Sequence, residues 1–182
     1  MGSSAHLLLG CLLVATACGT DPPEPTPPGP SNLNLAIGTG AADGMPGFVP
    51  ITDGQELMLE PGAQGGFHVF VNVRLDQEGV SAVGDFPIIS REARRVATGQ
   101  LVSKAQHKVR LTAGGANFDT EKSIPLFLCP TPIGIPVADE MLELKVEVRS
   151  TEDSAPITGT IRFLPRCPGG DQNTFCQRIC FG

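Results

Sequence analysis

The sequence predicts an all-β domain: an antiparallel, immunoglobulin-like sandwich of two sheets with about seven to nine short strands. Three observations lead to this prediction. Apolar residues recur at every second position in several stretches, glycine-containing turn dipeptides separate these stretches, and no long stretch has the helical period. The chain holds 22 glycines and 17 prolines, yet 41% of its residues are hydrophobic, so it combines many turns with the composition of a folded protein.

The expected strands of the N-terminal half begin near Leu33. Apolar residues alternate over 33–37, a short run covers 57–59, and a long alternation covers 67–75. Every second residue from Phe67 onward is apolar, as on a strand that buries one face. The turn signals between and after these runs are Asp53-Gly54, Pro61-Gly62, Gly65-Gly66 and Glu78-Gly79.

The expected strands of the C-terminal half lie at 109–111, 142–148 and 157–163, and the turn signal Gly114-Gly115 follows the first of them. The alternation over 142–148 is the clearest in the chain. Its apolar residues are separated by three charged ones: Glu143, Lys145 and Glu147. Residues 90–96 fit either one helical turn or one arm of a hairpin, and the sequence leaves this open.

The N-terminus predicts export. The apolar run 7–17 is shorter than the ~20 residues of a membrane-spanning helix, and it has the length and small-residue ending of a signal peptide. The segment Val14-Ala15-Thr16-Ala17-Cys18 resembles the lipobox of bacterial lipoproteins, although no Lys or Arg precedes the run and Ala15 stands where Leu is usual. This resemblance implies lipidation at Cys18, and Gly19 after it implies sorting to the outer membrane.

Two alternatives to Cys18 stay open. The segment Leu8-Leu9-Gly10-Cys11 also matches a lipobox, but cleavage there would leave too short an apolar run for export. In the other alternative, Cys18 belongs to the signal peptide of a secreted protein and cleavage occurs later. We therefore expect a signal peptide at 1–17 and lipidation at Cys18.

The rest of the chain divides into three parts. Residues 18–32 form a tether, in which six prolines between Pro22 and Pro30 favour an extended polyproline II spacer over simple disorder. Residues 33–166 form the sandwich. Residues 167–182 form a tail with little that can be buried, so we expect it to fray unless disulfides hold it.

Composition excludes several classes of function. The formal net charge is −6, and the one basic cluster, Arg91, Arg94 and Arg95, is expected on a solvated turn or edge strand. This balance argues against nucleic acid as a partner. The chain has no Trp and no Tyr, which makes polysaccharide and choline sites poor candidates because such sites rest on the faces of these rings.

Four cysteines remain after Cys11 is lost with the signal and Cys18 is lipidated: Cys129, Cys167, Cys176 and Cys180. An even number in an exported chain predicts two disulfides. Three pairings are possible, and the isolated position of Cys129 requires at least one bond between the tail and the middle of the chain. The alternative, a zinc site, is disfavoured because the spacings lack paired CxxC hairpins.

Residues 60–75 carry a second resemblance. The run Gly62-Ala63-Gln64-Gly65-Gly66-Phe67-His68 is similar to a Gly-x-Gln-Gly-Gly-aromatic-His segment that enters a long strand in uncharacterised exported bacterial lipoproteins. The resemblance implies the fold and the location, and it implies no activity. The glycines themselves precede a strand and not a helix, so we expect a tight turn or bulge and no phosphate loop.

Catalytic motifs are not apparent. His68 and His107 are expected to point outward, and a catalytic or metal site would need them to meet a carboxylate, of which the candidates are Asp76, Asp85, Asp119 and Asp139. No Gly-x-Ser-x-Gly elbow occurs, and no loop has the oxygen ligands that calcium requires. Phe70 interrupts the polar face of its strand, so His68 and Phe70 mark a possible partner surface.

We therefore expect a non-enzymatic, lipid-anchored module of the cell envelope, with a binding or structural role, no metal and no cofactor. Its expected partners are the membrane, through the lipid, and an envelope protein; nucleic acid is excluded. The alternative is an envelope hydrolase whose site assembles only in the fold.

Overall fold

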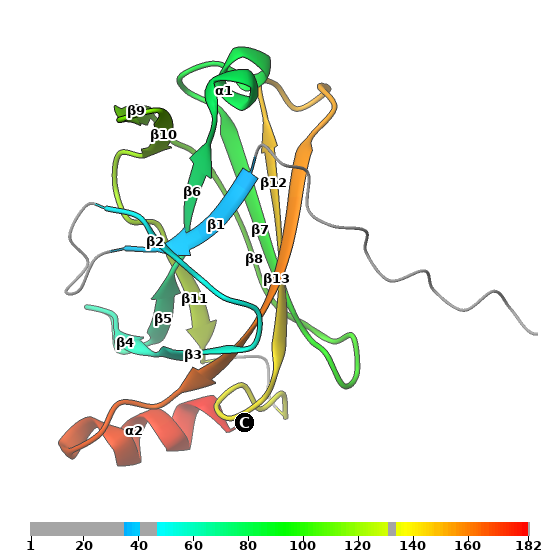
Figure 1. Ribbon diagram of the computed structural model, residues 1–182. Coiled ribbons are helices and arrows are strands. Elements are labelled where there is room, and N and C mark those ends of the chain that lie inside the picture. The colour runs from blue at the N-terminus through cyan, green and yellow to red at the C-terminus, as the bar shows by residue number, and fades with distance from the viewer. Residues whose placement is uncertain (1–34, 41–46, 131–133, 182) are drawn as a thin grey trace, which may run out of the picture.

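The computed structural model describes residues 35–40, 47–130 and 134–181, which form a two-layer β-sandwich with two short helices (Figure 1). The expected signal peptide at 1–17 and the tether at 18–32, with Cys11 and Cys18, lie outside these residues. All strand pairs but one are antiparallel, so the predicted fold class is confirmed.

The first layer is built from two sheets that share one stretch of chain. The larger sheet has the order β2-β1-β6-β10-β9, with bounds β1 (Leu35–Thr39), β2 (Val49–Pro50), β6 (Asn72–Leu75), β9 (Leu111–Gly114) and β10 (Asn117–Thr120). The smaller has the order β11-β5-β4, with bounds β4 (Glu60–Pro61), β5 (Phe67–Phe70) and β11 (Pro125–Cys129). Because β5 leads directly into β6, the two sheets continue one another (Figure 1).

The second layer is one sheet of five strands in the order β3-β13-β12-β7-β8. The bounds are β3 (Gln55–Met58), β7 (Ile88–Arg95), β8 (Leu101–Lys108), β12 (Leu142–Arg149) and β13 (Ile157–Arg166). The edge strand β3 pairs with the end of β13 in the parallel sense. The helices are α1 (Gln77–Val83) and α2 (Asp171–Cys180), and α2 lies across the lower end of the sandwich in Figure 1.

The core follows the period of two that the sequence shows. The inward residues of the 67–75 stretch are at most 2% exposed, and those of β12 are 0% exposed. They are Phe67, Val69, Val71, Val73 and Leu75 on one side and Leu142, Leu144, Val146 and Val148 on the other. Each such side chain contributes about 1.5–3 kcal/mol to folding by leaving water, so these two stretches anchor the sandwich.

The chain contains more and shorter strands than the expected seven to nine. The described residues form thirteen strand segments. One cause is the interruption of the 67–75 strand at Val71, whose N–H donates to the carbonyl of Ile124 at 2.9 Å. Residues 90–96, left open by the sequence, lie mainly in β7.

Two helices replace segments that were expected to be irregular. The Glu78-Gly79 turn signal lies in α1, because Asp76 caps this helix by accepting from the N–H of Gly79 at 2.7 Å. The tail folds into α2, where Cys176 and Cys180 are buried and Asp171 lies in the first turn. The two cysteines are four residues apart and lie on one face of the helix. Two buried positions are too few to identify an amphipathic helix from the sequence.

The prediction for Arg91 was wrong. Its side chain is 0% exposed, because β7 is an inner strand of its sheet and Arg91 is on the face toward the core. Arg94 points to the opposite face and has a side chain that is 46% exposed, as expected for a solvated position. Arg95, the third member of the cluster, has a side chain that is only 13% exposed and pairs with Glu140, so of the three arginines only Arg94 is as solvated as expected.

Candidate functional site

Three rings cluster on the outer face of the small sheet: His68 and Phe70 from β5 and Phe127 from β11. In the antiparallel pair β5–β11, Phe127 lies directly opposite His68. The ring centroids of His68 and Phe70 are 4.8 Å apart in an edge-to-face arrangement, and those of His68 and Phe127 are 5.2 Å apart. We call these three residues the aromatic surface. Phe127 is its most exposed member, at 54%.

His68 does not point into solvent as expected. It is 7% exposed, and its Nδ1 atom is buried without a hydrogen-bond partner. Phe70 and Phe127 contact its ring, and this burial lowers the pKa of His68 below its ordinary value. The imidazole is therefore neutral near pH 7 and supports the two phenyl rings as an apolar group would.

Phe127 is the member of the surface that the sequence reasoning missed. Its neighbours Leu126 and Leu128 are at most 1% exposed, whereas Phe127 points outward between them. The apolar run 124–128 conceals this difference, because a period of two cannot be seen where every residue is apolar. Successive side chains on a strand point to opposite faces, so Phe127 points outward while both of its neighbours are buried.

The glycine run forms the turn that enters β5. The N–H of Gly62 donates to the carbonyl of Gly66 at 2.7 Å, and Gly65 has φ of 84°, a conformation that favours glycine. A Cβ atom on Gly66 would lie 2.5 Å from the carbonyl oxygen of Cys129, so only glycine permits this approach of the turn to β11. The expectation of a tight turn is confirmed, and the turn packs closely against the end of β11 at Cys129.

A buried arginine fixes β11 from behind. The Nη1 atom of Arg91 donates to the carbonyls of Ile124 and Pro125 at 3.0 and 3.1 Å, and Nη2 donates to Nδ1 of His107 at 2.7 Å. Burial lowers the pKa of Arg91 to about 10, which leaves it charged at neutral pH. Since Pro125 is opposite Phe70 in the β5–β11 pair, Arg91 positions the strand that carries the aromatic surface.

The structure does not bring the histidines together with the candidate carboxylates. His107 accepts from Arg91 on Nδ1, and burial followed by the charge of Arg91 lowers the pKa of His107. Three of the four carboxylates make contacts within the fold: Asp76 caps α1, Asp119 pairs with Arg74, and Asp139 pairs with Arg166.

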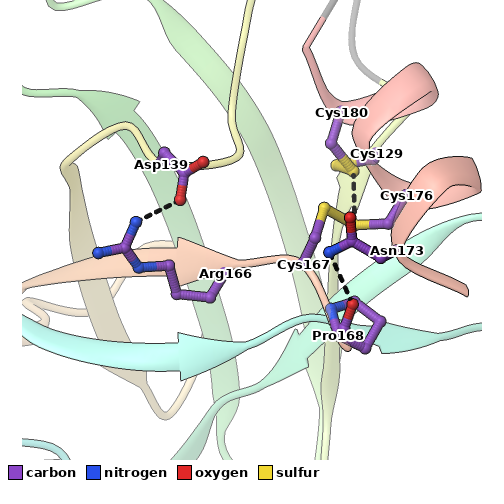
Figure 2. The surroundings of a disulfide bond; sticks show 8 residues. All are labelled: Cys129, Asp139, Arg166, Cys167, Pro168, Asn173, Cys176 and Cys180. Carbon is purple, nitrogen blue, oxygen red and sulfur yellow. Dashed lines mark hydrogen bonds and ion pairs between the residues drawn. A yellow bond between two sulfur atoms is a disulfide. The ribbon is translucent and has the colours of Figure 1, made fainter. Parts of the chain in front are cut away.

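The four cysteines form two neighbouring disulfides, Cys129–Cys180 and Cys167–Cys176 (Figure 2). The Sγ atoms of Cys167, Cys176 and Cys180 lie within 4.8 Å of one another, which is close enough for a shared metal ion. Both disulfides, however, consume the thiolates that would be the ligands. The first bond closes 51 residues of sequence and ties α2 to β11, as the isolated position of Cys129 required.

Comparisons with known proteins add the following. No protein-family model and no curated protein matches this chain. The fold is similar to the CooA pilin subunit from enterotoxigenic Escherichia coli, with a TM-score of 0.35 and 9% sequence identity, over 75% of this chain and 99% of the pilin chain. A similarity at this TM-score carries no argument about function. Within residues 35–40, 47–130 and 134–181, no helix is long and apolar enough to span a membrane.

Proposed function

We propose that this protein is a non-enzymatic module of the bacterial cell envelope, anchored to the outer membrane by lipid on Cys18. In this proposal the proline-rich tether holds the sandwich away from the membrane. The sandwich then offers its aromatic surface to an envelope protein with a complementary apolar surface. Two disulfides in the fold support the exported location, because such bonds persist in oxidising compartments.

The observation that carries the binding role is the exposure of Phe127, 54%, next to the ring of His68 and within the same cluster as Phe70. An aromatic side chain held on a rigid strand loses little conformational entropy when a partner covers it. The strand is rigid here because Arg91 fixes its first residue and the Cys129–Cys180 disulfide fixes its last. Aromatic anchors of this kind supply most of the binding energy in many protein interfaces.

The binding role is tested with Phe127→Ser and with Phe86→Ser as its matched control. Phe86 is 50% exposed, and its ring faces Lys108 instead of the aromatic surface. Each lipidated protein is cross-linked in its native envelope and purified, and the captured proteins are quantified by mass spectrometry. We expect one envelope protein to be captured by the wild type and by Phe86→Ser, and to fall about tenfold or more for Phe127→Ser.

Equal capture by all three proteins, or no protein enriched above an envelope that lacks the bait, contradicts the binding role. Thermal unfolding of both variants checks that the substitutions leave the fold intact, as is usual at exposed positions.

The anchor is tested by Cys18→Ser with Cys11→Ser as control. Cys18→Ser should move the protein from the membrane fraction to the soluble envelope fraction, because the acyl chains supply the membrane affinity. Cys11→Ser should leave the protein in the membrane fraction. Retention of the Cys18→Ser protein in that fraction contradicts the anchor.

A further inference from the structure

The two disulfides differ in access but touch one another. The residues of the Cys129–Cys180 bond are 2% and 0% exposed. The other bond joins Cys176, which is 0% exposed, to Cys167, which is only partly buried. The nonbonded distance between Sγ of Cys176 and Sγ of Cys180 is 3.8 Å, so the bonds are in van der Waals contact beneath α2 (Figure 2).

Thiol–disulfide exchange proceeds by attack of a thiolate on one sulfur of a disulfide. A thiolate from solvent needs access to that sulfur, and Cys167 is the one cysteine of the four whose residue has appreciable exposure. The buried bond has a different neighbour, the Sγ atom of Cys176, which is already in contact with it. The Cys167–Cys176 disulfide is therefore the outer bond, which solvent can reach, and the Cys129–Cys180 disulfide is the inner bond next to it.

We propose that exchange reaches the buried Cys129–Cys180 disulfide through Cys176, so that the two bonds act as a relay. In the first step an external thiolate, from a small thiol or a dithiol reductant, attacks Sγ of Cys167. The Cys167–Cys176 bond breaks, a mixed disulfide forms at Cys167, and the electron pair leaves on Cys176 as a thiolate.

In the second step the Cys176 thiolate attacks Sγ of Cys180. A Cys176–Cys180 disulfide forms within α2, the Cys129–Cys180 bond breaks, and the electron pair leaves on Cys129. Each step breaks one disulfide and forms another, so the number of disulfides is unchanged. One external thiolate enters the first step, and one thiolate, on Cys129, is left after the second. Cys176 and Cys180 lie four residues apart on one helix face, where side chains are neighbours.

The relay controls how α2 is attached. Before exchange, a covalent bond ties the helix to the end of β11. After exchange, the remaining contacts include the N–H groups of Val137 and Ala138 donating to the carbonyl of Cys180 and the packing of Phe175 on Phe67. The redox state of the outer bond therefore sets whether the helix can leave the sandwich and expose a thiol on Cys129.

The relay is tested by reduction of the folded protein with dithiothreitol, quenched by alkylation and followed by mass spectrometry of the cysteine peptides. The test variant is Cys167→Ala/Cys176→Ala, which keeps only the inner bond. We expect reduction of Cys129–Cys180 to be about tenfold or more slower than in the wild type, because the attacking thiolate next to it is missing. If the outer bond only shields the inner one, its removal accelerates reduction instead, and this result or an unchanged rate overturns the proposal.

A second variant keeps the test independent of rates. Cys167→Ser leaves a free thiol at Cys176 beside the intact inner bond. We expect the purified protein, without any reductant, to contain some Cys176–Cys180 disulfide and a free thiol on Cys129. A free thiol confined to Cys176 overturns the proposal.

Asn173→Ala is the control for loosening of the helix. It removes the hydrogen bond from Asn173 Nδ2 to the carbonyl of Pro168, keeps every sulfur, and should retain the wild-type pattern of reduction.

Discussion

The outer faces of the two layers are built on opposite principles, although both come from the same alternating pattern. On the second layer, each of two carboxylates is held between two cations: Glu92 between Arg94 and Lys104, and Glu147 between Lys145 and Arg149. Hydrogen bonds from these cations lower the pKa of both carboxyls. On the first layer, the same outward positions carry rings and buried polar groups.

Asn72 illustrates the difference. It lies on the outward side of its strand but is 0% exposed, because its Nδ2 atom donates to the carbonyl of Gly47 at 2.7 Å and its Oδ1 atom accepts from the N–H of Ile124 at 3.2 Å. Segments distant in sequence thus cover this position of the first layer, although Phe127 on the same layer stays exposed, whereas the two carboxylate clusters of the second layer lie at its surface. A period of two therefore identifies which residues share a face, whereas contacts from distant segments decide whether a residue on the outer face is exposed to solvent.

Removal of a disulfide should reduce stability most, because both bonds tie α2 to the ends of strands in the sandwich. Cys129→Ala/Cys180→Ala should lower the free energy of unfolding by about 4 kcal/mol, from the long loop that the bond closes. Cys167→Ala/Cys176→Ala should cost about 2.5 kcal/mol, because that loop is short. Denaturant unfolding of both variants measures the difference, and a larger loss for the second pair would contradict the assignment of the inner bond as the main tie.

The next largest change in stability is expected from Arg91 and Arg94, which lie on opposite faces of β7. Arg91→Met removes the buried guanidinium that donates to the carbonyls of Ile124 and Pro125 and to Nδ1 of His107, and we expect a loss of about 3 kcal/mol in the free energy of unfolding. Arg94→Met on the exposed face removes only surface contacts and should cost less than about 1 kcal/mol. Similar losses for the two variants in urea unfolding would refute the distinction between the core-facing and the solvent-facing side of β7.

The pH dependence of stability sharpens the comparison at His68. The pKa of His68 is lowered in the folded protein, whereas a histidine in the unfolded chain has a pKa of about 6.5. Below that pH the unfolded chain therefore binds a proton that the folded chain does not bind, and this favours unfolding. The free energy of unfolding should therefore fall as the pH falls below about 6.5, down to the lower folded pKa. His107 has a lowered pKa and contributes in the same direction. His68→Leu should flatten part of this decline, and an unaltered pH profile would show that His68 is solvated.

The smallest expected effect concerns the solvated face. Glu147→Gln removes both ion pairs of that carboxylate, and we expect a loss of about 1 kcal/mol or less because the pairs are at the surface. The loss should shrink further in 1 M salt, where screening acts over about 3 Å. A loss of several kcal/mol that persists in salt would show that this face is covered in solution.

Much of the architecture follows from local sequence. The inward positions of 67–75 and 142–148, the turn at Gly62–Gly66 and the need for a bond between Cys129 and the tail are all properties of short segments and residue spacing. The same reasoning failed for His68 and Arg91, and it missed Phe127. The burial of His68 and Arg91 depends on the groups that pack against their strands, and the exposure of Phe127 is hidden by the uniformly apolar run in which it lies.

The all-β class and the sides of the main strands follow from the amino-acid sequence alone, because alternation, turn chemistry and composition act over a few residues. The pairing of the disulfides, the helix in the tail and the cluster of His68, Phe70 and Phe127 become visible only in the folded chain. The physical reason is that these features join β5, β11 and the tail, segments that the order of the strands in space brings together and that no local rule relates.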